Sequence, residues 1–403
     1  MEKLGIEDEF DKLPIHMNHN TLFSTSTILS SIITGIICGQ DSLMKIENFT
    51  NDPLVQQRLG LHKNICDSSL SGRLKKFTMS LTNDLMGINA GLSGKVSKKT
   101  KGREEIIDID STVKTVYGSQ QGAEQGYNDK KKGAKSYHPI MAFKNSTREC
   151  ILSWLRSGNS HTANNAVGFI KQMMTMLSPK LKHILIRADS GFFSECLIEC
   201  IESYKNTNYL IKVKLKNLSK ILEGRDWEEV PGMRGVEICN FEYRPTSWKK
   251  PRHFYAVRKL QKVETEGRLF PKKVYQNFCY CTNIVDNPLQ IHRLYGDRGT
   301  CENWIEHVKN QMFGGKILTN DFWANEALWQ MSVMAYNIMI WMRKLTDEYS
   351  WRQEPRTFRG WFIQLAGKLV TRSRQIYLKM YEFYYQQDRW RKIGSAINKL
   401  NFA

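Results

Sequence analysis

The chain has 403 residues, of which 41% are hydrophobic, so it is long enough to bury a large core in two or three domains. It carries 59 Lys and Arg against 40 Asp and Glu, and the formal charge of +19 favours salt-dependent binding to nucleic acid. We find no stretch long enough to span a membrane, no signal peptide in the acidic N-terminus, and no disulfide or zinc pattern among the nine cysteines. We therefore expect a cytoplasmic protein; the alternative to a nucleic-acid partner is a merely basic globular protein.

Residues 1–95 are predicted to form an N-terminal helical region. Apolar residues recur at three- and four-residue spacing in 42–46 and 70–81, and 67–77 opens like a capped helix before turning basic. This region either binds DNA ends or packs on the rest of the chain as a plain helical domain. Residues 91–103 are polar, basic and rich in glycine, which predicts a linker.

Strands dominate the first part of the stretch 104–204. Apolar runs at 105–113, 138–143 and 150–158 predict three strands, and a fourth at 183–192 lies between two helical patterns at 163–177 and 194–204. Strands followed by alternating helix and strand indicate a mixed fold of the α+β or α/β class.

Residues 205–287 alternate polar and apolar side chains with period two, which predicts a β-rich, largely antiparallel segment. Between residues 244 and 273 we count ten Lys or Arg against two Glu, so one side of this sheet could follow a DNA backbone.

The chain is predicted to be helical again from residue 288 onward. Residues 323–345 are long, apolar and rich in Met, Trp and Ala, which indicates a buried helix. Residues 346–403 are expected to form a C-terminal helical region with arginine-aromatic clusters, including one at 377–390. That surface either contacts DNA or a second protomer, or is the solvated face of amphipathic helices.

Three acidic residues stand at the ends or centres of predicted strands. Asp108 and Asp110 lie two apart in one apolar strand and therefore project from the same face. Asp189 ends another apolar strand, before Ser190 and Gly191. Because a buried carboxylate is costly without a partner, these acids are candidate metal ligands, although each alone could be a turn or capping residue.

Further along the chain, one motif contains Tyr295, Arg298, Glu302 and Lys309, at successive spacings of three, four and seven residues. If the chain is helical from about residue 299, Glu302 and Lys309 lie nearly two turns apart on one face. A carboxylate that holds a metal, flanked by cations that hold phosphates, suits phosphodiester chemistry.

In these residues the sequence resembles a large group of bacterial insertion-sequence transposases of the DDE type, whose signature is Tyr-Arg-Glu-Lys. Asp110 followed by Ser111 and Thr112 is similar to the first catalytic aspartate of that group, and Asp189 with its neighbours is similar to the second. The resemblance covers about residues 104–345 and continues more faintly into the arginine-rich tail.

This resemblance implies a ribonuclease-H-like catalytic core, formed by residues 104–204 and 288–345 and interrupted by the β-rich insertion 205–287. It implies that Asp110, Asp189 and Glu302 are catalytic and hold two divalent ions, normally Mg²⁺ with Mn²⁺ as a substitute, about 3.5–4 Å apart. It also implies that Tyr295, Arg298 and Lys309 bind DNA phosphates near the cleavage point.

The implied activity is cleavage at the ends of a mobile element and joining of the 3′-hydroxyls to target DNA. The implied partners are double-stranded DNA, as terminal inverted repeats and target, and a second protomer in a homodimeric synaptic complex. Two alternatives stay open, namely a metal-dependent nuclease without joining activity and a domesticated DNA-binding protein derived from a transposase. An RNA-binding protein is a weaker alternative because no aromatic RNA-recognition motif is visible.

Three further points stay open at the level of sequence. Asp108 could replace Asp110 as the first ligand, and Glu306, one turn after Glu302, could in principle replace the glutamate. Three tryptophans are candidates either for stacking on a displaced base or for core packing. They are Trp227, Trp248 and Trp304.

Overall fold

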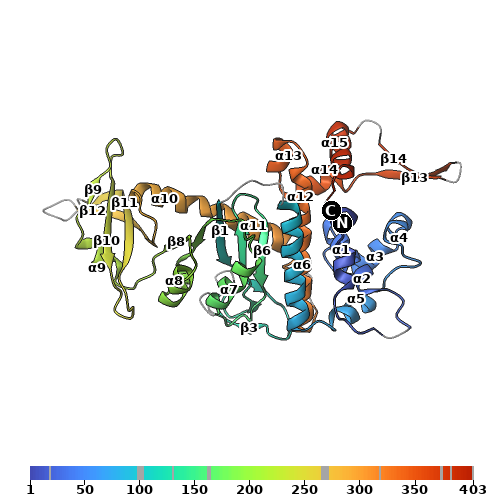
Figure 1. Cartoon of the computed structure of the whole chain (residues 1–403), viewed down its shortest axis with the longest axis horizontal. Helices are drawn as coiled ribbons and strands as arrows, with labels where there is room; N and C mark the ends of the chain where they lie inside the picture. The colour runs from blue at the N-terminus through green and yellow to red at the C-terminus, as the bar shows by residue number, and fades with distance from the viewer. Residues whose placement is uncertain are drawn as a thin grey trace.

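A nine-stranded sheet runs through the computed structural model of this chain, in the order β6-β5-β1-β7-β8-β12-β11-β10-β9 (Figure 1). The structure describes residues 1–17, 20–97, 104–128, 131–160, 165–264, 272–316, 319–372, 375–381 and 384–401. The strands are β1 (Glu104–Ser111), β5 (Ile140–Lys144), β6 (Cys150–Trp154), β7 (His183–Ala188), β8 (Thr207–Lys212), β9 (Glu228–Glu229), β10 (Val236–Tyr243), β11 (Arg252–Glu264) and β12 (Lys272–Thr282).

The first five strands in this order form one core sheet, and the fifth of them, β8, lies within the segment 205–287 that the sequence assigned to the insertion. Strand β1 pairs antiparallel with β5, which pairs antiparallel with β6, whereas β7 and β8 follow β1 in parallel. Three antiparallel strands continued by two parallel ones is the ribonuclease-H-like topology, so the predicted fold class is confirmed. The carboxyl ends of β1, β7 and β8 consequently meet at one edge of the sheet.

Successive side chains of β1 and β7 point alternately to the two faces of the sheet, and a separate hydrophobic core covers each face. Ile107, Ile109 and Ile186 face the core that α7 (Ala166–Met176) and α8 (Glu195–Glu202) cover. The opposite face carries Asp108 and Asp110 and is covered by α10 (Pro288–Gly296) and α11 (Thr300–Glu306). Since successive residues of a strand point to opposite faces, the acids share a face with the helix that bears Glu302.

The segment 205–287 is β-rich, as its alternation predicts, and it continues the core sheet. Tyr280 of β12 pairs with Lys212 of β8, and this short contact joins the insertion to the core. Helix α9 (Leu218–Glu223) and the stacked rings of Phe241 and Phe254, 5.6 Å apart, pack on one face of the insertion.

The structure describes six helices in the N-terminal region, and three of them, α2 (Thr25–Cys38), α5 (Asp67–Leu74) and α6 (Met79–Ser97), pack on the long helix α12 (Phe322–Lys344). The other three are α1 (Ile6–Asp11), α3 (Leu43–Thr50) and α4 (Pro53–Leu59), and a short 3₁₀ turn, η1 (Glu2–Leu4), precedes α1. The helical pattern expected across 70–81 is interrupted between α5 and α6.

The linker predicted at 91–103 is wrong for its first seven residues, because α6 continues to Ser97. Residues 98–103 lie outside the described residues. In α6, Asn89 donates to the carbonyl of Cys150 at 3.1 Å and the Ser93 hydroxyl donates to Glu149 at 2.6 Å. These buried contacts to the core offset the low helix propensity of Gly91 and Gly94. The N-terminal region is therefore continuous with the core rather than tethered to it.

Helix α12 is buried along almost its whole length, as predicted, and it covers the edge of the sheet at β6. Its Asn337 accepts from the N–H of Cys150 at 2.9 Å and donates to the carbonyl of the same residue at 2.8 Å. Glu326 accepts from the N–H of Leu155 at 2.7 Å. Polar side chains of α12 thus form hydrogen bonds with backbone groups that would be unpaired at an open sheet edge.

No single described helix is long and apolar enough to cross a membrane; α2 and α3 pass such a test only as a pair, and they are bent by 98°.

The C-terminal region holds α13 (Glu348–Arg352), α14 (Pro355–Phe362) and α15 (Gln387–Asn398), together with a hairpin that the sequence reading did not predict. The expectation of an entirely helical 346–403 is wrong for β13 (Gly367–Arg372) and β14 (Gln375–Met380), which pair antiparallel. Val370, Thr371, Ile376 and Tyr377 are residue types that favour strands, and this preference overrides the arginine-aromatic pattern that suggested a helix.

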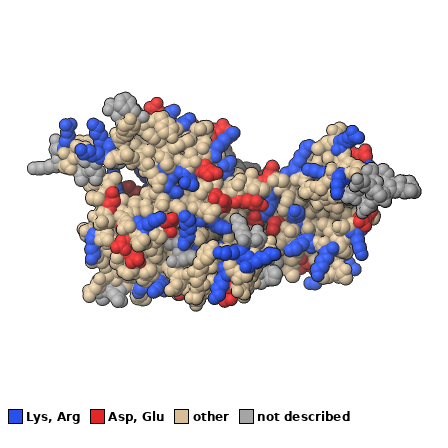
Figure 2. Space-filling model, turned by 180° about the vertical axis from the view of Figure 1, so that it is seen from behind, with Lys and Arg blue, Asp and Glu red and all other residues tan. Residues whose placement is uncertain are grey.

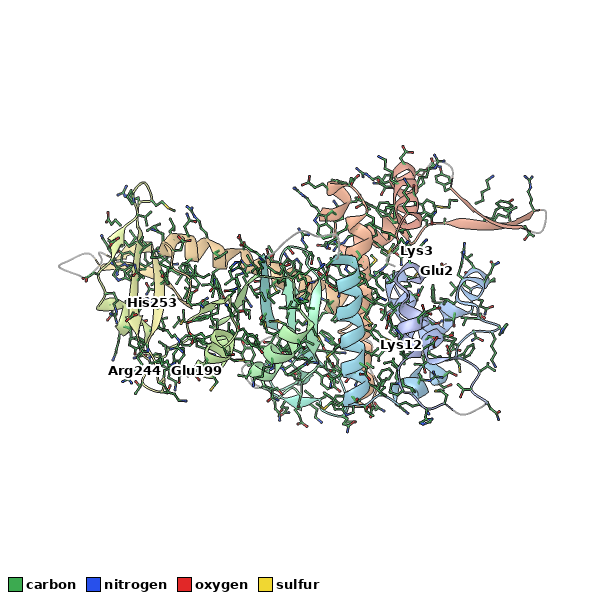
Figure 3. The ribbon with its side chains drawn as sticks, viewed as in Figure 1. Glu2, Lys3, Lys12, Glu199, Arg244 and His253 are labelled. Carbon is green, nitrogen blue, oxygen red and sulfur yellow. The ribbon has the colours of Figure 1, made fainter. Side chains whose placement is uncertain are left out.

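The whole chain is elongated, with the insertion and the N-terminal helices at opposite ends. Figure 3 shows Arg244 and His253 at one end and Lys3 and Lys12 at the other, with the core between them.

Candidate active site

A cavity of about 400 Å³ opens where β1, β7 and β8 end. The three acids predicted to be catalytic, Asp110, Asp189 and Glu302, all line it. Asp110 is the second-last residue of β1, Asp189 directly follows β7, and Glu302 lies in the first turn of α11. The other lining residues are Ser190, Lys212, Tyr295, Gly296, Arg298 and Gly299.

Asp110 is held in place by donors on both of its oxygens. Oδ1 accepts from the N–H of Ser111 at 2.8 Å, and Oδ2 pairs with a terminal nitrogen of Arg298 at 3.0 Å. Burial raises the pKa of Asp110 to about 6 against the lowering effect of Arg298, and the charges of Asp189 and Glu302 raise it further. The cavity therefore concentrates negative charge that a cation would stabilise.

Asp189 and Glu302 are oriented by local backbone. Asp189 is the N-cap of a short 3₁₀ turn, η2 (Ser190–Phe192), and its Oδ1 accepts from the N–H of Gly191 at 3.0 Å. Glu302 is exposed on α11 and faces the cavity. Glu306, one turn further on, instead accepts from Asn310 at 3.2 Å and from Gln311 at 3.1 Å, and does not line the cavity.

Asp108 lies on the same face as Asp110 but does not line the cavity. Its carboxylate is fully buried and accepts two hydrogen bonds from Arg187, at 2.7 and 2.8 Å, with a third from Asn145 at 3.2 Å. A carboxylate that already has these partners is satisfied without a metal. Of the two aspartates, Asp110 lines the cavity and Asp108 does not.

The residues expected to bind phosphates lie in different surroundings. Arg298 is buried, pairs with Asp110, and donates to the carbonyl of Ile109 at 3.2 Å. Burial lowers the pKa of Arg298, but the combined charges of its neighbours, with Asp110 contributing most and Tyr295 next, outweigh burial and raise that pKa. Lys309 donates to the Thr112 hydroxyl at 3.1 Å and to the Val113 carbonyl at 2.6 Å. Both cations therefore hold the end of β1.

Tyr295 lines the cavity, as expected for a DNA contact. Burial raises the pKa of Tyr295 to about 12, so its hydroxyl stays protonated and can donate a hydrogen bond at neutral pH. The Glu302–Lys309 spacing is not that of a regular helix, because a π-helical turn occupies His307–Gln311.

The sequence reading missed Lys212, an exposed lysine that lines the cavity. It is the last residue of β8, and β8 lies directly beside β7, the strand that Asp189 follows. The signal was an apolar strand followed by a polar residue, the same pattern that identified Asp189. Because Arg298 is paired with Asp110, Lys212 is the cavity lysine best placed to meet a ligand's negative charge.

The donor chemistry of the cavity suits a hard divalent cation, since three carboxylates supply oxygen ligands. As the side chains stand, no group of three His, Cys, Asp or Glu among the described residues is close enough to share an ion. The Arg298 guanidinium neutralises Asp110 in this arrangement. An ion bound by Asp110 would take over part of that neutralising role.

Of the three candidate tryptophans, Trp248 and Trp304 are buried and Trp227 is partly buried. Trp248 lies 4.9 Å from the ring of Phe193, Trp304 lies 5.7 Å from Phe143, and the guanidinium of Arg258 lies 4.3 Å over Trp227. These contacts favour core packing over base stacking.

Comparison with known structures gives only distant likenesses. The piggyBac transposase, in the cryo-EM structure of its synaptic complex with hairpin DNA, has a TM-score of 0.47 and 12% identity, covering 88% of this chain and 76% of that one. The Mos1 transposase paired-end complex with the left transposon end has a TM-score of 0.20 and 9% identity, and the Mos1 mariner complex with Mn has 0.19 and 10%. Each Mos1 match covers 48% of this chain and 60% of that one. TM-scores below 0.5 support no inference about mechanism or partner.

Family membership has firmer evidence. Among curated proteins, none matches this chain. The family model described as "Transposase DDE domain group 1", however, matches residues 1–402. Because that match spans almost every residue, the chain belongs to the DDE transposase family, group 1.

Proposed function

We propose that this transposase binds the ends of its element, cleaves them by metal-dependent phosphodiester hydrolysis, and joins the 3′-hydroxyl ends to target DNA. The observation that carries the proposal is the single cavity at the carboxyl ends of three strands, lined by Asp110, Asp189 and Glu302. A membership that covers residues 1–402 supports the same reaction class.

Asp110, Asp189 and Glu302 would hold two Mg²⁺ ions, for which Mn²⁺ could substitute. When bound, such ions lower the pKa of an attacking water or hydroxyl and stabilise the charge of the leaving oxygen. The chain itself supplies orientation. Ser111 and Arg298 hold the Asp110 carboxylate from two sides, and Gly191 holds that of Asp189.

Lys212 and Tyr295 would contact the DNA backbone at the cleavage point. Both line the cavity, and the hydroxyl of Tyr295 stays protonated at neutral pH, so it can donate a hydrogen bond. Arg298 and Lys309 would act as positioning residues, since each contacts β1 or the segment directly after it. This division differs from the expectation that all three signature residues bind phosphates.

The partners in this proposal are double-stranded DNA, as terminal inverted repeats and target, and a second protomer that synapses two ends in the cytoplasm. The formal charge of +19 supports a polyanionic partner. The homodimer is proposed from the need to hold two DNA ends together.

The decisive experiment is Mg²⁺-dependent cleavage of DNA that carries the repeats flanking the gene. Wild type should cleave at the repeat ends, and Asp110→Asn, Asp189→Asn and Glu302→Gln should lose cleavage while still binding. Glu306→Gln is the matched control, because Glu306 sits one turn from Glu302 yet outside the cavity. Full cleavage by the three acid variants would refute this active site.

Two related functions are separated by one further assay. Pre-cleaved ends carrying 3′-hydroxyls should be inserted into a target plasmid. A protein that cleaves but never joins is a nuclease. One that binds repeats without either reaction is a domesticated DNA-binding protein.

A further inference from the structure

The β13–β14 hairpin projects from the body of the molecule beside the C-terminal helices (Figure 1). Apart from each other, neither strand packs extensively on any other helix or strand that the structure describes. A two-stranded ribbon is marginally stable in water without a surface to pack on. The described part of the hairpin therefore presents surface that a partner outside this chain could cover.

The hairpin is positively charged, which favours a negatively charged partner. Lys368, Arg372 and Lys379 are exposed, and the sequence from residue 367 to 381 contains four basic residues and no acidic one. Figure 2 shows lysine and arginine side chains on this projecting end, at the left of that view. A ribbon with this composition attracts a polyanion.

The strand register places two positive charges opposite each other. Lys368 pairs directly with Lys379, and Val370 pairs with Tyr377, whose side chain is 50% exposed. Directly opposed like charges destabilise a two-stranded pairing. Because residues two apart in a strand share a face, Lys368, Arg372, Tyr377 and Lys379 all lie on one side of the ribbon. Repulsion among the positive charges on that side destabilises the isolated hairpin, and phosphate groups bound there would neutralise these charges.

We infer that the β13–β14 hairpin is a DNA-binding arm that lies along a groove of duplex DNA through the face bearing Lys368, Arg372, Tyr377 and Lys379. A two-stranded ribbon fits the major groove, which is about 12 Å wide. A second copy of this chain suits the face poorly, because it also carries a formal charge of +19. The inference rests on the proposed function in that it assumes duplex DNA is the substrate.

The test uses the full chain and a fluorescein-labelled duplex, with binding followed by anisotropy over a range of salt in EDTA. The variant is Lys368→Gln/Arg372→Gln/Lys379→Gln. Losing three phosphate contacts should lower the slope of log affinity against log salt by about 2 to 3. Because these side chains are exposed and neither strand packs extensively on another described helix or strand, thermal unfolding should stay unchanged.

A matched control removes the same charge elsewhere. Lys180, Lys182 and Lys205 are exposed and stand before β7 and β8, at the sheet edge opposite the cavity. The control variant Lys180→Gln/Lys182→Gln/Lys205→Gln should keep the wild-type slope within about 1. Equal slopes for the two triple variants would overturn the inference, because net charge alone would then explain the effect.

A second copy as the partner would give a different result. The hairpin variant would then shift the sedimentation coefficient toward a monomer and leave the salt slope unchanged, which would also overturn the inference. Binding in EDTA does not require chemistry. A wild type that binds through the arm but never cleaves DNA would therefore refute the proposed function alone.

Discussion

Arg187 holds both carboxylate oxygens of Asp108, with Nε–Oδ1 at 2.7 Å and the second contact at 2.8 Å, and also donates to the carbonyl of Leu294 at 2.5 Å. The two residues are direct neighbours across the parallel pairing of β1 and β7. The third contact reaches α10, which leads to the motif that contains Glu302. A buried ion pair thus joins β1 and β7, whose ends carry Asp110 and Asp189, and Arg187 links them to α10, which precedes the helix that carries Glu302.

Asp108→Asn should destabilise the protein by about 3 kcal/mol, because it leaves a buried guanidinium without its counter-charge. The free energy of unfolding in urea measures this. Divalent-ion binding should survive in the fraction that is folded. The double variant Asp108→Leu/Arg187→Met should be more stable than Asp108→Asn, since it removes both charges together. An Asp108→Asn protein as stable as wild type would contradict the structural role assigned to this pair.

Ion binding should depend on pH through Asp110, whose pKa is raised to about 6, mainly by burial. A proton and a cation compete for this carboxylate, so Mn²⁺ should raise the melting temperature above pH 6 and lose that effect as the pH falls through 6. Without an ion the sign reverses, since a raised pKa stabilises the protonated folded form. Stability should then fall as the pH rises from the ordinary value of 3.8 to about 6.

The control for this pH dependence is Asp110→Asn, which should show no stabilisation by Mn²⁺ at any pH. Differential scanning fluorimetry with and without the ion gives the comparison. Equal stabilisation of wild type at pH 5 and pH 8 would argue against Asp110 as a ligand.

Arg298→Ala should move the pH midpoint of Mn²⁺ binding upward. The guanidinium lowers the pKa of Asp110, so its loss lets burial and the two neighbouring acids raise that pKa further. Arg298→Lys keeps the positive charge and should restore part of the shift. The readout is the pH profile of ion affinity by calorimetry, and an unchanged midpoint in Arg298→Ala would refute a positioning role.

Lys309→Met should slow cleavage by about tenfold to a hundredfold, because it frees the segment after β1 from its two hydrogen bonds to Lys309. Duplex affinity and its salt slope should stay near wild type, since this lysine already contacts Thr112 and Val113. If the slope falls by about 1 instead, Lys309 contacts a phosphate as the sequence had suggested. Cleavage time courses at saturating protein separate the two outcomes.

Several features of the site follow from local pattern and were accessible from the sequence. Alternation in β1 placed Asp108 and Asp110 on one face, and the strand-end position of Asp189 pointed to a shared edge. The spacing around Glu302 predicted a helix that bears a carboxylate toward the site, and α11 begins at Thr300.

Other features depended on contacts between distant parts of the chain. Residues 91–97 were predicted to be a linker, yet Ser93 reaches Glu149 and keeps them helical. Residues 367–380 were predicted to be part of a helical region, yet they form a hairpin, in which Val370 and Ile376 are residue types that favour strands.

By itself, the sequence determined which acids are candidate metal ligands, because strand alternation and motif spacing are local properties of the chain. Only the tertiary structure decided between Asp108 and Asp110, since the choice depends on Arg187, which lies 79 residues away and occupies the first of them. It likewise turned Arg298 toward Asp110 and brought Lys212 into the cavity. The role of a charged side chain depends on which group it contacts. That contact depends on the pairing of strands that are distant in the sequence, which local residue spacing does not determine.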